Sequence, residues 1–209
     1  MLLPDLMMAR SVLPWLDIAG IAIFAVSGAL AAARCGQTIV TFVFFAAVTG
    51  TGGGTLRDLL IGAPVFWIHD NRALAVCLLA AIAVWVTPQQ IWPVKAIDWF
   101  DGLGLAAYAV FGSWKALAFG VPPLGAAAMG VVTACMGGII RDVLAGEPSI
   151  LLRPEVYVTA AALAAGLFVL LTMLGTPLLA AAAIAVGAGF VLRAFAIVRG
   201  IALPGYQDR

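Results

Sequence analysis

The segment Ala46–Pro64, which reads AAVTGTGGGTLRDLLIGAP, sets an arginine beside an aspartate within strongly apolar sequence. The same pattern returns over Gly130–Pro148 as GVVTACMGGIIRDVLAGEP, and the two copies align without a gap. The identical positions of the first copy are Val48, Thr49, Gly53, Gly54, Arg57, Asp58, Leu60, Gly62 and Pro64, which fall on Val132, Thr133, Gly137, Gly138, Arg141, Asp142, Leu144, Gly146 and Pro148. A match of this length indicates an internal duplication.

The duplication extends toward the N-terminus, because Asp17–Gly36 is repeated at Asp101–Gly120. The residues LAAARC at Leu30–Cys35 loosely resemble the cleavage site of a signal peptide. A segment that has a second copy inside the chain is expected to be retained as a structural unit.

The composition places the chain in a lipid bilayer. Of its 209 residues 64% are apolar and 10% are charged, and the mean hydropathy is +1.13. A hydrocarbon core of about 30 Å takes about 20 apolar residues per helix, which leaves room for seven spans. The net charge of +1 gives no support for a nucleic-acid partner. Cys35, Cys77 and Cys135 lack the spacing of a metal site, so we expect packing residues and no cofactor.

The apolar runs predict an all-α membrane protein that forms a single transmembrane domain over residues 1–209. Repeat one covers about 15–88, repeat two about 98–174, and a seventh helix about 178–198. Because each repeat holds three spans, the second enters the membrane from the opposite side, as an inverted repeat. The predicted spans are Trp15–Ala33, Thr38–Gly62, Ala73–Val86, Asp98–Leu117, Leu124–Gly146, Val156–Leu174 and Leu178–Val198.

The basic residues predict the orientation, since cytoplasmic loops carry an excess of lysine and arginine. The side that holds the N-terminus has Arg10, Arg72 and Lys115, whereas the other side has Arg34, Lys95, Arg153, Arg193, Arg199 and Arg209. We therefore expect a multi-pass protein of the plasma membrane with its C-terminus in the cytoplasm and its N-terminus outside.

The glycines of the motif predict interrupted helices. Gly50, Gly52, Gly53 and Gly54 crowd into one span, and each lowers helix stability by about 1 kcal/mol relative to alanine. Gly137 and Gly138 repeat the pattern in the fifth span. We expect both spans to break there and the two breaks to face each other at the midplane, where half-helix ends bind ions.

Two arginines and two aspartates follow these glycines. A charge at the bilayer centre costs about 2.5–3.5 kcal/mol on insertion scales, so Arg57, Asp58, Arg141 and Asp142 need partners. Since neighbours in a helix point about 100° apart, we expect the pairs Arg57–Asp142 and Arg141–Asp58. The network would line, narrow or gate an ion path, with Thr49, Thr133 and Lys115 as accessory residues. In the structural alternative, the arginines lie one turn inside the span ends, reach water, and hold the repeats together.

Three further charged residues receive structural interpretations. Asp17 and Asp101 stand near predicted span starts, where a carboxylate caps a helix. Lys115 stands near a span end, and we expect its ammonium group to reach the interface. Because the chain contains no Gly-x-Ser-x-Gly, His-Glu-x-x-His or Walker sequence, we expect no enzyme.

With GGGTLRD at Gly52–Asp58, GGIIRD at Gly137–Asp142 and a three-plus-three-plus-one layout, the chain resembles the prokaryotic trimeric intracellular cation channels, the TRIC family. The resemblance implies a homotrimer, in membrane lipid, with one pore per subunit. It implies conduction of monovalent cations, potassium or sodium, along the two broken spans. The implied pore residues are the glycine breaks with Arg57, Asp58, Arg141 and Asp142. The chain departs from the pattern at Met136, which stands where the first copy has Gly52, and lacks the basic lipid-phosphate cluster of eukaryotic members.

Two classes of function fit this sequence. The first is a passive potassium channel, and the second is a secondary transporter of a small solute such as an amino acid. Inverted repeats with discontinuous helices are typical of such carriers as well. The two arginines and two aspartates balance, so cation selectivity follows from the resemblance alone.

Overall fold

The structure is a computed structural model that describes residues 3–152 and 156–203, without the side chains of residues 3–14 and 16. Its elements are α1 (Leu3–Arg34), α2 (Ile39–Leu60), α3 (Phe66–His69), α4 (Asn71–Val86), a 3₁₀ turn at Gln89–Ile91, α5 (Ala96–Ala118), α6 (Pro123–Ala145), a second 3₁₀ turn at Ile150–Leu152, α7 (Val158–Met173) and α8 (Leu178–Arg199). The predicted all-helical fold is confirmed.

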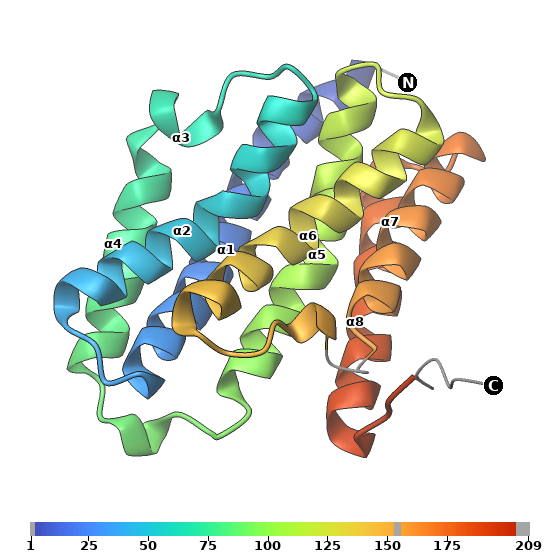
Figure 1. Cartoon of the computed structure of the whole chain (residues 1–209). Coiled ribbons are helices and arrows are strands. Elements are labelled where there is room, and N and C mark those ends of the chain that lie inside the picture. The colour runs from blue at the N-terminus through green and yellow to red at the C-terminus, as the bar shows by residue number, and fades with distance from the viewer. Residues whose placement is uncertain (1–2, 153–155, 204–209) are drawn as a thin grey trace.

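The helices follow the duplication seen in the sequence. α1, α2 and α4 correspond to α5, α6 and α7, and α3 corresponds to the second 3₁₀ turn. α2 and α6 run obliquely across the bundle in opposite directions, and α8 packs against α5 and α7 at its edge. α1 begins and α8 ends at opposite ends of the bundle (Figure 1).

The lengths of the helices suit a membrane. Asp17–Arg34 of α1 and the whole of α2, α6 and α8 are long and apolar enough to cross one, while α4 and α7 are shorter apolar helices. Large apolar side chains are exposed along the outside, among them Leu79, Val143 and Val191. Such a surface is expected where lipid replaces water. The count of seven crossings stays a prediction.

Two expectations about the ends of the chain need revision. α1 begins at Leu3, well before the predicted start at Trp15, and continues through Pro14; a proline removes one hydrogen bond from a helix without always ending it. The orientation expected from the basic residues places Arg193 among the interfacial charges, but the structure buries it within α8, where its guanidinium lies 5.3 Å from the ring centroid of Tyr157. Arg153, Arg209 and the side chain of Arg10 lie outside the described part of the chain.

The predicted breaks at the glycines are wrong, because α2 and α6 run without interruption through them. The glycines instead let the two helices touch. A Cβ atom on Gly53 would lie 2.2 Å from the carbonyl oxygen of Thr133, and one on Gly137 would lie 2.5 Å from that of Thr49. The glycine cost in helix stability is therefore offset by backbone contact at the crossing of α2 and α6.

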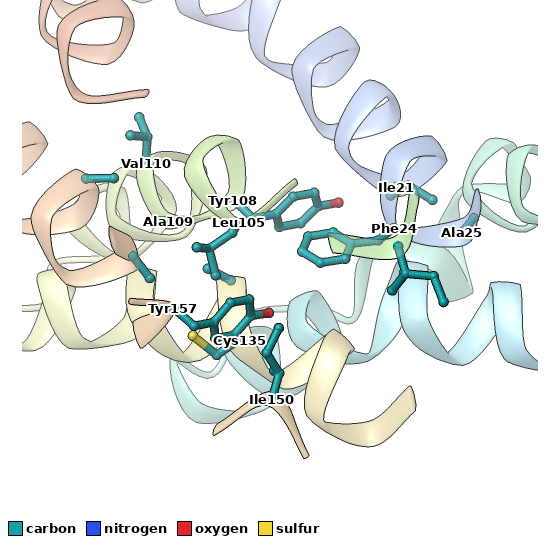
Figure 2. Close-up of a cluster of buried hydrophobic side chains, with 14 of the residues drawn as sticks. Ile21, Phe24, Ala25, Leu105, Tyr108, Ala109, Val110, Cys135, Ile150 and Tyr157 are labelled. Carbon is teal, nitrogen blue, oxygen red and sulfur yellow. The ribbon is translucent and has the colours of Figure 1, made fainter. Parts of the chain in front are cut away.

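The same symmetric use of glycine joins α1 to α5. Gly20 faces the ring of Tyr108, and its equivalent Gly104 faces the ring of Phe24. The two rings meet edge to face with centroids 5.4 Å apart, within the buried cluster of Figure 2. The core is thus built twice around one pseudo-two-fold axis.

Glycine also ends α2 and α6, as the sequence indicates. Gly62 and Gly146 have φ angles of +70° and +69°, in the left-handed region that stops a helix. Both helices therefore finish shortly after their Arg-Asp pair.

Gly53→Ala is expected to lower the free energy of unfolding by about 1–3 kcal/mol, because the new methyl group overpacks the crossing. The matched control is Gly187→Ala in α8, where a Cβ meets nothing within 4 Å and should be neutral or stabilising. Denaturant titration of the purified protein in detergent measures both. Equal stability of the two variants would contradict the close crossing.

Candidate functional site

The two Arg-Asp pairs lie on opposite sides of the crossing between α2 and α6. Each pair follows its crossing glycine by about one helical turn, roughly 6 Å along the axis, and the two helices run in opposite directions. α5 shows the separation directly, because its late residue Lys115 contacts Asp58 whereas its early residue Asp101 contacts Arg141. The motifs thus form two sites, one toward each end of the bundle.

The expected pairing across the repeats is wrong. Nε of Arg57 donates to Oδ1 of Asp58 over 2.8 Å, and Nε of Arg141 donates to Oδ1 of Asp142 over 2.9 Å. Adjacent residues leave a helix in different directions, but the long arginine side chain bends back far enough to reach its neighbour. Since the two sites lie at opposite ends, the cross-repeat partners are out of reach.

The first site, around Asp58, is a buried cluster of three charged groups. The side chains of Arg57 and Asp58 are 0% exposed, and that of Lys115 is 17% exposed. Nζ of Lys115 lies 2.8 Å from Oδ1 and 2.9 Å from Oδ2 of Asp58, so this lysine pairs inside the protein instead of reaching the interface. The guanidinium of Arg57 also lies 5.1 Å from the ring centroid of Phe111. The contacting charges sum to +1.

The second site, around Asp142, has a different set of partners. Nη1 of Arg141 lies 2.5 Å from Oδ1 of Asp101, and Nη2 lies 2.8 Å from Oδ1 of Asp142. Nη1 also donates to Oγ of Ser27. Arg141 is 2% exposed and Asp101 is fully buried, so neither group reaches bulk water. The contacting charges of Arg141, Asp101 and Asp142 sum to −1.

Asp17 and Asp101 do not cap helices. α1 and α5 begin well before these residues, and both carboxylates accept from partners on other helices. Asp101 binds Arg141, whereas Asp17 accepts a hydrogen bond of 3.0 Å from the hydroxyl of Tyr108. The sequence did not predict Asp101 as a partner of the Arg-Asp motif. The one sequence signal for it is that Asp101 and Asp17 occupy equivalent positions of the duplication.

Each motif aspartate also holds the loop that follows its helix. The backbone N–H of Phe66 donates to Oδ2 of Asp58 over 3.2 Å, and that of Ile150 donates to Oδ2 of Asp142 over 2.8 Å. Phe66 and Ile150 are equivalent in the duplication. The aspartates therefore connect a buried arginine to the chain reversal after α2 and after α6.

The remaining candidate residues lie at the crossing or beside it. Oγ1 of Thr133 donates to the carbonyl oxygen of Met129 over 2.6 Å, while Oγ1 of Thr49 is buried without a hydrogen bond. Gly54 makes room for the ring of Phe66, and Gly138 makes room for the hydroxyl of Tyr157. Gly52 lies near the side chain of Ile140.

A cavity of about 150 Å³ adjoins the second site. Arg141 and Asp142 line it together with Arg34, Asp98 and Glu147. The second site thus opens into a charged space toward the end of the bundle where α1 and α6 finish.

Arg141→Met is expected to destabilise the protein by about 3–5 kcal/mol, because it leaves two carboxylates buried without their counter-charge. The double variant Arg141→Met/Asp101→Asn should lose less, since one of those charges is removed. Arg72→Met is the matched control: Arg72 pairs with Asp70 on the surface, where a lost ion pair changes little. Denaturant titrations give the comparison, and a double variant no more stable than Arg141→Met contradicts the assigned pair.

Comparison with known proteins agrees with the doubled architecture. A family model described as "Glycine transporter" matches twice, over residues 14–89 and 98–173. A UPF0126 membrane protein of Vibrio cholerae is 44% identical over 155 residues, which are 72% of this chain and 64% of that protein. The UPF0126 inner membrane protein YadS of Escherichia coli is 40% identical over 151 residues, covering 70% of this chain and 72% of YadS.

Solved structures of high similarity are TRIC channels. The TRIC trimeric intracellular cation channel orthologue from Rhodobacter sphaeroides has a TM-score of 0.85 and 41% identity, and the match covers 91% of this chain and 100% of that one. A prokaryotic TRIC channel crystallised in 0.5 M KCl has a TM-score of 0.83 and 28% identity over 93% of this chain and 100% of that one. The chain is thus a multi-pass membrane protein that belongs to the prokaryotic TRIC family.

Proposed function

We propose that this protein is a passive channel for monovalent cations, with potassium as the principal ion, and that it acts as a homotrimer with one pore in each subunit. The observation that carries the proposal is the pair of buried Arg-Asp sites on either side of the α2/α6 crossing. These sites occur in a chain whose sequence is 41% identical to that of the Rhodobacter cation channel orthologue and whose fold is similar to it. We propose that the protein transports ions and is not an enzyme.

The buried charges favour a pathway over a purely structural motif. Charged side chains at membrane depth are expensive and usually mark an ion or substrate path. Here they extend along α2, α5 and α6 from Lys115 at one end to Asp142 at the other, interrupted by the crossing. We infer that ions pass along this line.

The proposed path is closed at the crossing in the conformation described. Gly53 and Gly137 bring the backbones of α2 and α6 into contact, which leaves no room for an ion between them. Conduction therefore requires the two helices to separate there. The residues assigned to the path are Gly52, Gly53, Gly54, Arg57, Asp58, Gly137, Gly138, Arg141 and Asp142, with Thr49, Thr133 and Lys115 as accessory residues.

The location follows from the same reasoning. We propose the plasma membrane as the site of action, with lipid around the trimer, the N-terminus outside and the C-terminus in the cytoplasm. The support is the excess of basic residues toward the C-terminal side.

A second candidate function is secondary transport of a small solute. The description "Glycine transporter" of the matching family model favours it, and inverted repeats are the usual basis of alternating access. The α2/α6 crossing would then be the point at which a carrier closes around its substrate.

Planar-bilayer recording of the purified protein under a potassium chloride gradient separates the two candidates. We expect unitary current steps, because an open channel conducts many ions during each opening. The steps should reverse near the potassium equilibrium potential, because the proposed pore is selective for potassium. Native mass spectrometry of the same sample is expected to give three chains. A silent bilayer with an intact oligomer, combined with glycine uptake into liposomes, would favour the carrier.

Asp58→Asn and Asp142→Asn are expected to change the unitary conductance or the ratio of cation to anion permeability, because each removes a carboxylate from the proposed path. Asp70→Asn, at an exposed carboxylate outside that path, is the matched control. Recordings of trimeric samples give the comparison. Unchanged permeation in both pathway variants argues against the assignment of these residues.

A further inference from the structure

The two Arg-Asp sites differ at one position of the duplication. Lys115 of the second repeat is equivalent to Ala31 of the first. At the first site, the ammonium of Lys115 bridges both oxygens of Asp58. At the second site, the equivalent residue is Ala31, whose methyl group cannot bridge the oxygens of Asp142.

The remaining bonds of the two aspartates are similar. Oδ1 of Asp142 accepts from Nε and Nη2 of Arg141, and Oδ2 accepts from the N–H of Ile150. Asp58 accepts from Nε of Arg57 and from the N–H of Phe66. A carboxylate has about four acceptor positions. Asp142 therefore retains one acceptor position, on Oδ2, the oxygen through which Asp58 also accepts from the ammonium group.

The cavity beside Asp142 occupies the corresponding place. Its volume is about 150 Å³, and both Ala31 and Asp142 line it. One water molecule needs roughly 10–15 Å³ of such volume, so the cavity has room for an ion together with several waters. The charged lining residues are Asp98, Asp142, Glu147, Arg34 and Arg141, which carry a net formal charge of −1.

We propose that this cavity is a binding site for a partly hydrated monovalent metal cation such as potassium, with the carboxylate of Asp142 as its ligand. The cation takes the place that the ammonium of Lys115 has at Asp58. Glu147 adds negative charge to the same cavity. The proposal rests on the proposed function in that the bound ion is the conducted one.

The charge of the site selects against divalent metals. Calcium sites in proteins combine several carboxylate and carbonyl oxygens. Two guanidinium groups line this cavity and oppose the high positive charge of a divalent ion. A partly hydrated monovalent cation fits this cavity better than a divalent one.

Cation-dependent unfolding of the purified trimer in detergent tests the site. Potassium chloride replaces N-methyl-D-glucamine chloride at constant ionic strength, and tryptophan fluorescence reports the unfolding temperature. We expect a saturable rise of about 3 °C for the unsubstituted protein, because a ligand stabilises the state that binds it. Ala31→Lys supplies a tethered ammonium and should abolish the rise.

Glu147→Gln is a second variant that tests the site even if Ala31→Lys does not fold. Glu147 is exposed, so its substitution perturbs no packing. We expect it to raise the potassium concentration of half-effect by about fivefold, through loss of a nearby negative charge. Asp70→Asn, which removes an exposed carboxylate outside this cavity, is the matched control and should respond like the unsubstituted protein.

Three results overturn the site: no response to potassium, an unchanged potassium concentration of half-effect in Glu147→Gln, or a response to glycine in place of potassium. The binding test is separate from the recordings. A conducting protein without this response keeps the channel proposal and loses the site. A silent protein with the response keeps the site and loses the channel proposal.

Discussion

A charge withdrawn from water must meet an opposite charge or a hydrogen bond within reach, and each Arg-Asp pair of this chain meets that need first within its own helix and then on α5. The arginine binds the aspartate next to it, and the aspartate also binds the loop that follows. The pair is thus both a buried charge cluster and the connection between a long helix and its chain reversal. Because α5 supplies the further partners, Lys115 and Asp101, the helices α2 and α6 cross without sharing charges, and the crossing itself is left to glycine and backbone.

The duplication explains why α5 contributes to both sites. In an inverted repeat, one helix passes the two copies of a motif at its two ends, so Asp101 and Lys115 serve different copies. α1 is its equivalent, yet it supplies Ser27 to Arg141 and no cation to Asp142. Sequence divergence within the same backbone has therefore made the two ends chemically different.

The sequence predicted the helical membrane fold and the positions of the helices, because apolar runs and glycine stops are local signals. The doubled motif likewise marked Arg57, Asp58, Arg141 and Asp142 as a set. Other features required the third dimension. A glycine cluster has the same appearance whether it breaks a helix or admits a second backbone, and here Gly53 and Gly137 do the latter. The pairing of the arginines depended on how far apart the two motifs lie, which no spacing in the chain reveals.

When the duplicated Asp17 and Asp101 are counted alike, the two sites differ by the single positive charge of Lys115, and this difference has a further consequence. The two sites form a dipole that lies along the bundle, although the backbone is nearly symmetric about an axis across it. A membrane potential acts on such a dipole with about 2.3 kcal/mol per elementary charge per 100 mV for full transfer across the membrane. The two orientations of this protein in a membrane therefore differ in energy when a membrane potential is present, although its two repeats have nearly the same backbone.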